Sequence, residues 1–345
     1  MVDTMTTGRP TATPERVRQG ARTAAACLNI REGDRVFIIT DTARADLAAL
    51  VACACEERGG ATTIRQLEEY GRRPLTTFPD ALRADIAAAT PTATYYIATA
   101  QPGELALRQP LLPFLAQELK VRHGHMIGIT PDVMADAMCA DYDRVYARTM
   151  QVYDIVKGAR TIHVTSTTGS DVMATFRPDW RWIPCHGRYD TQGMWGNLPE
   201  GETFTTPATL DGTIVASVLG DYFSEKYGVL ARPVTFVVED GLIQLIEAAD
   251  RGLTEELRRH FWEAPHGRRA RAGEFAIGTL EGLGGLSGNL LQDEKMPGLH
   301  VAFGNPYPQF TGADWESPVH VDVVVSDCTI VVDERAIMRE GRFTI

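Results

Sequence analysis

The chain has 345 residues, of which 44% are hydrophobic and 23% are charged, and these values are typical of globular proteins. A formal net charge of -11 at pH 7 argues against a surface built to bind nucleic-acid phosphates. No apolar run approaches the roughly 18 residues that a membrane-spanning helix needs, so we expect neither a nucleic acid nor a membrane as a partner. The length favours two domains.

The N-terminal segment, residues 1–12, is rich in Thr, Pro and Gly and lacks the apolar stretch of a secretory signal. We expect this segment to be disordered. The 6 cysteines have no paired spacing, which favours free thiols in a reducing compartment. Together these features predict a cytoplasmic protein.

Residues 13–160 alternate between helix and strand patterns. Thr13 followed by Pro14 is typical of a helix start, with Thr13 as the N-cap. The elements expected after this helix are strands at 35–40, 61–67, 92–99 and 125–130, and helices at 42–58, 79–89, 109–119 and 131–157. Apolar strands separated by helices pair in parallel, so we predict an α/β domain with a mainly parallel sheet.

Residues 161–345 change to alternating apolar and polar positions. A hairpin is predicted through Thr168 and Gly169, and another through Asp240 and Gly241, with one helix at about 249–262. We therefore place a domain boundary near residue 160. The predicted fold class is α/β, with a second, strand-rich α+β domain that carries a metal site.

Five candidate ligands for that metal site lie in the second domain, and each stands in an apolar stretch: Glu202, Glu274, His300, His320 and Asp322. Buried carboxylates need a partner to stay ionised, and a metal ion is such a partner. His320 and Asp322 are two positions apart, so on a strand they share one face and can converge on one ion. Taken alone, a His-x-Asp pair on a strand is more often a hydrogen-bonded core histidine or an edge residue than a set of metal ligands. The full set is sufficient for a pair of divalent ions with one bridging carboxylate.

The sequence motifs around these residues resemble those of the aminopeptidase T/aminopeptidase S family of metallo-exopeptidases. In "NLPEGETFTTP", Glu202 matches a metal-binding glutamate of that family, and Glu274 in "GEF" matches a second. In "HVAFGNPY", His300 matches a ligand and Tyr307 matches a catalytic tyrosine.

The strand "HVDVVV" completes the resemblance, because His320 and Asp322 match the last two ligands. The resemblance also implies a homodimer that acts on small molecules or short peptides. The chain departs from the peptidases in being shorter and in having Leu299 where a threonine is usual. The same fold serves a ring-cleaving branch, the 2,5-dihydroxypyridine dioxygenases.

Three functions follow, and the first is preferred. The first is a metallohydrolase, an aminopeptidase-like metalloprotease or amidase with two Zn, Co or Mn ions that activate water. In it Glu274 and Tyr307 are catalytic, with Tyr307 donating a hydrogen bond to the oxyanion.

The second is a dioxygenase with one Fe(II) held by His320, Asp322 and either His300 or another histidine. It gives Glu202 and Glu274 no ligand role, which is why the hydrolase is preferred. The third is a non-catalytic protein that binds a small molecule.

Overall fold

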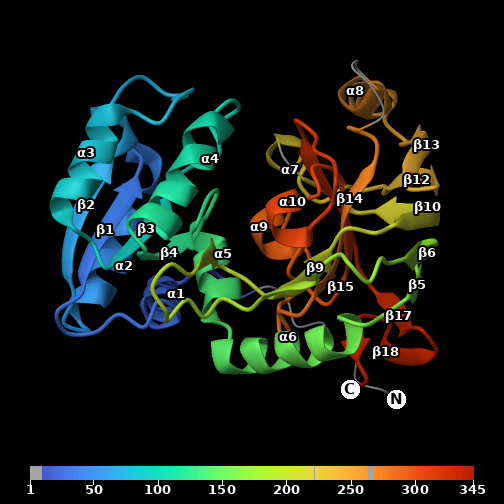
Figure 1. Ribbon diagram of the computed structural model, residues 1–345, viewed down its shortest axis with the longest axis horizontal. Helices are drawn as coiled ribbons and strands as arrows, with labels where there is room; N and C mark the ends of the chain where they lie inside the picture. The colour runs from blue at the N-terminus through green and yellow to red at the C-terminus, as the bar shows by residue number, and fades with distance from the viewer. Residues whose placement is uncertain (1–9, 221, 263–267) are drawn as a thin grey trace. The chain divides into compact units, whose positions relative to one another are not determined.

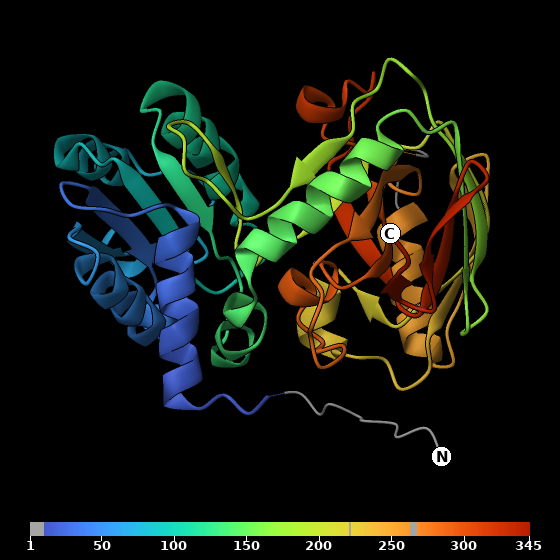
Figure 2. The same cartoon turned by 90° about the horizontal axis from the view of Figure 1, so that it is seen from below.

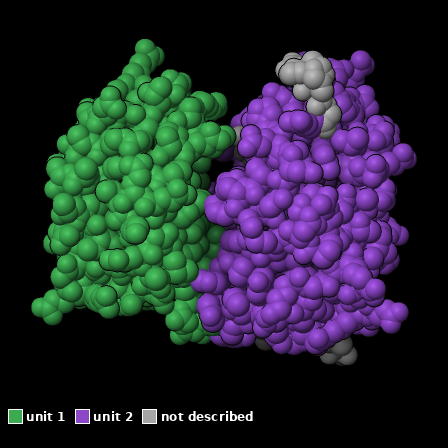
Figure 3. Space-filling view, in the orientation of Figure 1, with its two compact units in different colours: residues 1–143, 187–200, 282–284 green, residues 144–186, 201–281, 285–345 purple. Residues whose placement is uncertain are grey.

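The computed structural model describes residues 10–220, 222–262 and 268–345 of the chain. It forms two compact units, which Figure 3 colours separately. Within the described residues, unit 1 contains 10–143, 187–200 and 282–284, and unit 2 contains 144–186, 201–281 and 285–345. The predicted disorder at the N-terminus concerns residues that mostly lie outside this description.

Unit 1 is built on sheet A, in which every adjacent pair of strands is parallel. Its strand order is β2-β1-β3-β4-β8, with β1 (Arg35–Thr40), β2 (Ala61–Gln66), β3 (Ala93–Ile97), β4 (Arg122–His125) and β8 (Trp195–Asn197). Figure 1 shows helices flanking this sheet. They are α1 (Pro14–Cys27), α2 (Ala45–Glu56), α3 (Asp80–Ala89), α4 (Leu105–Pro113) and α5 (Pro131–Ala135).

The start of α1 is as predicted, because the Thr13 hydroxyl accepts a hydrogen bond from Arg16 N–H. The single helix expected over 131–157 is wrong. It is divided into α5 and α6 (Tyr142–Val156), since Asp141 accepts a bond from the Asp143 N–H and so caps a new helix.

The strand expected at 125–130 is also misplaced. The observed strand β4 begins at Arg122 and ends at His125. Its polar side chains are buried with partners, Arg122 with Asp34 and His123 with Thr94. A search for apolar runs therefore passes over it.

Unit 2 contains two antiparallel sheets. Sheet B has the order β13-β12-β10-β6-β5-β17-β18-β19, with β5 (Thr161–Ser166), β6 (Asp171–Thr175), β10 (Thr209–Ala216), β12 (Val234–Glu239), β13 (Leu242–Glu247), β17 (Cys328–Val332), β18 (Arg335–Arg339) and β19 (Arg342–Phe343). Sheet C has the order β11-β16-β15-β14-β9-β7, with β7 (Ile183–Cys185), β9 (Glu202–Thr205), β11 (Val218–Leu219), β14 (Ala272–Gly278), β15 (Gly298–Gly304) and β16 (His320–Val325). Both predicted hairpins are present, as β5–β6 and β12–β13.

The core of unit 2 lies between sheets B and C. Phe236 of sheet B stacks on Phe303 of sheet C with ring centroids 5.8 Å apart. Helix α8 (Arg251–Trp262) adds Phe261, and α6 adds Val152 and Val156 to the same cluster. Figure 2 shows the length of α6 in green. Burying each such phenylalanine stabilises the fold by about 1.5–3 kcal/mol.

The short helices of unit 2 are α7 (Tyr222–Tyr227), α9 (Leu290–Asp293) and α10 (Pro308–Thr311). All six cysteines are free thiols, as expected. The combination of a parallel sheet with large antiparallel sheets confirms the predicted fold class.

Candidate metal centre

One face of sheet C carries all five predicted metal ligands. The cross-strand register pairs Glu274 with Ala302 and Ala302 with Asp322, so these side chains form one row. His300 and His320 are each two positions from that row on β15 and β16, and therefore share its face. The opposite face of the same strands, with Val321 and Val323 on β16, packs into the core. This confirms that Val321 points away from His320 and Asp322.

Small residues lie between the ligands on this face. Ala276 pairs with His300, and Gly278 pairs with Glu202 on the neighbouring strand β9. Ala302 stands between Glu274 and Asp322. Because Gly and Ala project little or nothing from the sheet, the longer acidic and imidazole side chains can turn toward one another above them.

The first group of donor atoms combines Glu274, His320 and Asp322, whose atoms lie within 4.8 Å of one another. The Nε2 atom of His320 is 3.6 Å from Glu274 Oε2 and 3.7 Å from Asp322 Oδ2. The other ring nitrogen, Nδ1, is 2.9 Å from the carbonyl oxygen of Asn305. A carbonyl can only accept, so Nδ1 carries the hydrogen and Nε2 keeps its lone pair for a metal.

The second group combines Glu202, Glu274 and His300. His300 Nε2 lies 3.2 Å from Glu202 Oε2 and 3.2 Å from Glu274 Oε1, and the geometry of a hydrogen bond is met only toward Glu274. Among the described residues, the buried Glu202 Oε2 has no hydrogen-bond donor. A buried carboxylate oxygen without a donor is a position at which a cation would be stabilised.

The structure adds two charged residues that were not predicted as ligands, Glu294 and Lys295. Glu294 forms a further group with His300 and Asp322. The buried ammonium of Lys295 is 2.8 Å from Glu202 Oε1 and 2.8 Å from Glu294 Oε1. In the sequence, both residues belong to the run "QDEK", and charged runs of this kind are usually exposed to solvent. Only the position of this run next to a Gly-rich loop could have suggested that its side chains are buried.

The pKa values of these groups are shifted because this face buries more carboxyl groups than cations. Burial raises the pKa of Glu202, but the Lys295 ammonium and the neighbouring His300 outweigh it, and the pKa falls to about 2. Burial also raises the pKa of Glu294, to about 8, since the nearby Asp322 and Glu202 add to it and Lys295 only partly opposes it. Burial lowers the pKa of His300, but Glu202 and Glu274 raise it well above the usual value.

The pKa of His320 is also raised, because the charges of Asp322 and Glu274 outweigh the effect of burial. Both histidines therefore bind a second ring proton more tightly than usual, and a metal ion would compete with that proton. The set of carboxylate oxygens and imidazole nitrogens, with one orphaned oxygen, suits a divalent ion such as Fe, Mn, Co or Zn. Among the described residues, no group of donor atoms contains both His300 and His320.

Tyr307 borders this face through its ring, whose centroid is 4.5 Å from that of His320. Its backbone has a φ of 49°, in the left-handed region, and its N–H donates to Asn305 Oδ1 at 2.9 Å. Asn305 thus fixes both Tyr307 and, through its carbonyl, His320. The side chain of His320 is 19% exposed, against 7% or less for the other predicted ligands, so the site opens beside His320 and Tyr307.

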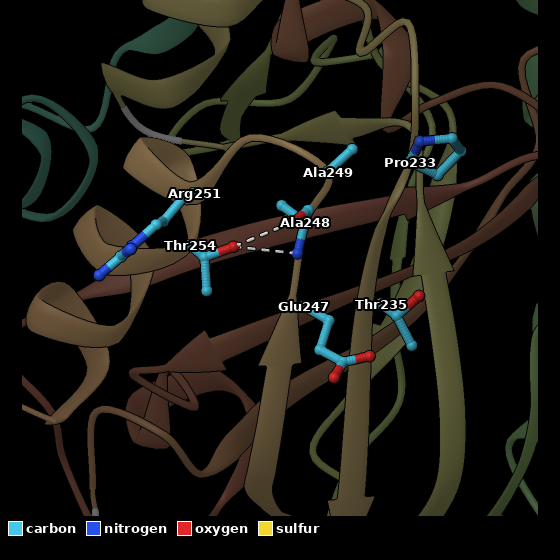
Figure 4. Close-up of a pocket in the computed structure, with 7 residues that line it drawn as sticks. All are labelled: Pro233, Thr235, Glu247, Ala248, Ala249, Arg251 and Thr254. Carbon is cyan, nitrogen blue, oxygen red and sulfur yellow. Dashed lines mark hydrogen bonds between the residues drawn. The ribbon is translucent and has the colours of Figure 1, made fainter.

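His266, a spare histidine for an iron site, lies outside the described residues. A shallow groove of about 450 Å³ lies at the N-terminal end of α8 (Figure 4). Two of its polar side chains are engaged locally, because Thr254 bonds with Ala248 and Arg251 pairs with Glu255.

Comparison with known proteins identifies the family. The sequence model of 2,5-dihydroxypyridine 5,6-dioxygenase (NicX) matches residues 19–274. A protein of that name from Pseudomonas putida KT2440 is 25% identical over 222 residues, which are 61% of this chain and 61% of that protein. The chain thus matches less than two thirds of the length of this curated relative.

Two solved structures share the fold. The 2,5-dihydroxypyridine dioxygenase of Pseudomonas putida KT2440 has a TM-score of 0.68 at 17% identity, covering 97% of this chain and 98% of that one. AmpT from Thermus thermophilus has a TM-score of 0.68 at 17% identity, with coverages of 96% and 99%. At this identity the likeness concerns the fold alone. No helix among the described residues has the length and apolarity to cross a membrane.

These findings correct the expected chemistry. The prediction of a metallohydrolase of the aminopeptidase type is wrong, because the family match and the named relative both belong to the ring-cleaving branch. The motifs around Glu202 and Glu274 led to that error, since a site with five ligand positions was assumed to use all of them for metal. The chain belongs to the 2,5-dihydroxypyridine 5,6-dioxygenase family.

Proposed function

We propose that this protein is a ring-cleaving dioxygenase that adds both atoms of O₂ to a dihydroxylated nitrogen heteroaromatic such as 2,5-dihydroxypyridine. The match of the family over residues 19–274 carries this proposal. The face of sheet C supports it independently, because it gathers buried oxygen and nitrogen donors beside a partly exposed histidine.

We assign a single Fe(II) to the group of His320, Asp322 and Glu274. These three donor atoms lie within 4.8 Å of one another, and His320 is oriented by the Asn305 carbonyl. Three protein ligands leave open positions for other molecules. When bound, the iron would supply coordination positions for the substrate and O₂ and the unpaired spins that let a singlet aromatic ring react with triplet O₂, while the electrons that reduce O₂ come from the ring.

The remaining residues prepare the site for that chemistry. Tyr307 packs on the His320 ring, holds its orientation, and borders the open side where an aromatic substrate would arrive. His300 Nε2 can hold a proton between Glu202 and Glu274, at 3.2 Å from each. A hydroxyl proton released by the substrate therefore has a nearby carboxylate acceptor in Glu202, whose pKa is lowered.

The test is oxygen uptake by protein loaded anaerobically with Fe(II) and then given 2,5-dihydroxypyridine. We expect one O₂ consumed per ring lost, with both atoms of ¹⁸O₂ in the product. Asp322→Asn is the matched control, because it keeps the shape of the side chain and removes the charge that holds the metal. Absence of oxygen uptake with every dihydroxypyridine isomer, in protein that retains iron, would contradict the proposal.

A further inference from the structure

A lysine ammonium is buried inside the acidic face described above. The side chain of Lys295 is 1% exposed, and its Nζ lies 2.8 Å from one oxygen each of Glu202 and Glu294. Removing an ammonium from water costs several kcal/mol, so such a group persists only where anions compensate it. Its position is therefore set by the two carboxylates.

Those two carboxylates are also donors in potential metal groups. Glu202 belongs to the group with Glu274 and His300, and Glu294 belongs to the group with His300 and Asp322. Neither belongs to the group that we assign to iron. The ammonium of Lys295 thus bonds to carboxylates that a second divalent ion would require.

The backbone holds the lysine in this place. The carbonyl of Lys295 accepts from Leu280 N–H at 2.8 Å, and its N–H donates to Gln292 at 3.0 Å. A Cβ at Gly278 would lie 1.9 Å from the Met296 carbonyl oxygen, so only glycine allows this segment to approach β14 so closely. The ammonium is consequently presented by a fixed main chain next to the sheet.

We propose that Lys295 is a resident cation that competes with a second metal ion for the carboxylates of Glu202 and Glu294 and so restricts the centre to one divalent ion. This inference rests on the single-iron function proposed above. Four carboxyl groups face the centre, from Glu202, Glu274, Glu294 and Asp322, and the Lys295 ammonium lies 2.8 Å from an oxygen of Glu202 and 2.8 Å from an oxygen of Glu294.

The experiment counts metal ions in three proteins: wild type, Lys295→Met, which keeps the length and removes the charge, and Lys295→Arg, which keeps the charge. Each is loaded with Mn²⁺ and analysed by elemental analysis and electron paramagnetic resonance. We expect about one ion per chain in wild type and Lys295→Arg. We expect about two in Lys295→Met, with the spectrum of a spin-coupled pair.

One ion in a folded Lys295→Met protein overturns the inference and leaves the single-iron function standing. Two ions in wild type would instead refute the single-iron function itself. Should Lys295→Met fail to fold, the double variant Lys295→Met/Glu294→Gln removes one charge of each sign. Glu202, Glu274 and His300 remain in it, so a second ion is still expected, and a count of one overturns the inference.

Discussion

The two units both bury charged side chains, but they do so in different ways. In unit 1, Arg73 forms ion pairs with Asp41 and Glu104, and its Nε donates to Glu104 at 2.8 Å. Asp41 also accepts from Thr99 N–H at 2.8 Å. In unit 2, the face of sheet C has more carboxylates than cations and leaves Glu202 Oε2 without a donor among the described residues.

This difference distinguishes buried charges that stabilise the fold from buried charges that form a functional site. A cluster in which every buried carboxylate oxygen has a hydrogen-bond donor, as Asp41 and Glu104 have in unit 1, stabilises one conformation and needs nothing from outside. A cluster that buries four carboxyl groups and leaves one oxygen without a donor, as in the described part of unit 2, is stabilised by a further cation. The two clusters are therefore expected to respond differently to mutation, metal and pH.

Removing a ligand should have the largest effect. His320→Ala deletes the imidazole of the proposed iron site, and iron content and oxygen uptake should fall by at least about 100-fold, since losing even an outer hydrogen-bond partner of a ligand costs 10–100-fold. Iron analysis and oxygen electrode traces measure this. Thermal unfolding should stay close to wild type without metal, and a collapsed fold would contradict a purely functional role.

Arg73→Met tests the fully hydrogen-bonded cluster of unit 1. It leaves Asp41 and Glu104 buried without their cation, so the free energy of unfolding should fall by about 3–5 kcal/mol. Urea denaturation followed by circular dichroism provides the value. Arg251→Ala, which breaks the exposed pair with Glu255, is the control and should change it by about 0.5 kcal/mol or less. Equal losses in both variants would contradict the distinction between buried and exposed pairs.

Asn305→Ala tests the support of the iron ligand. The Asn305 side chain accepts from Tyr307 N–H and donates to the Ser317 carbonyl, and so holds the loop whose carbonyl orients His320. Iron affinity should fall by about 10–100-fold while the fold persists. Competition with a chelator measures the affinity. Unchanged affinity would show that the loop is held by other contacts.

A smaller effect on the free energy of unfolding is expected when the pH is lowered. Burial raises the pKa of Asp41, but hydrogen bonds from Thr99 and the pairing with Arg73 outweigh it, and the pKa is lowered. The resulting stabilisation is complete above the unfolded value of about 3.9 and is lost as pH falls toward the folded value. Asp41→Asn should therefore flatten the loss of stability below about pH 4. A slope equal to that of wild type would exclude this linkage.

Sequence reasoning reached the five candidate ligands through the resemblance of their surrounding motifs to a known family, and the strand pattern placed His320 and Asp322 on one face. It could not place Lys295, since the approach of its backbone to Gly278 depends on packing between segments that are distant in the chain. It also missed β8, whose three residues "WGN" have no strand pattern of their own and gain their structure from β4. The expected homodimer and cytoplasmic location stay predictions.

Residues 187–200 belong to unit 1, and this limits how the chain can be divided into separate domains. This segment supplies β8, the edge strand of sheet A, although it lies between two segments of unit 2. No single cut in the chain can therefore release either unit intact. A truncated chain ending near residue 143 would expose β4 as a bare sheet edge and invite aggregation. Engineering unit 1 as a free module would require a circular permutation or a spliced-in strand.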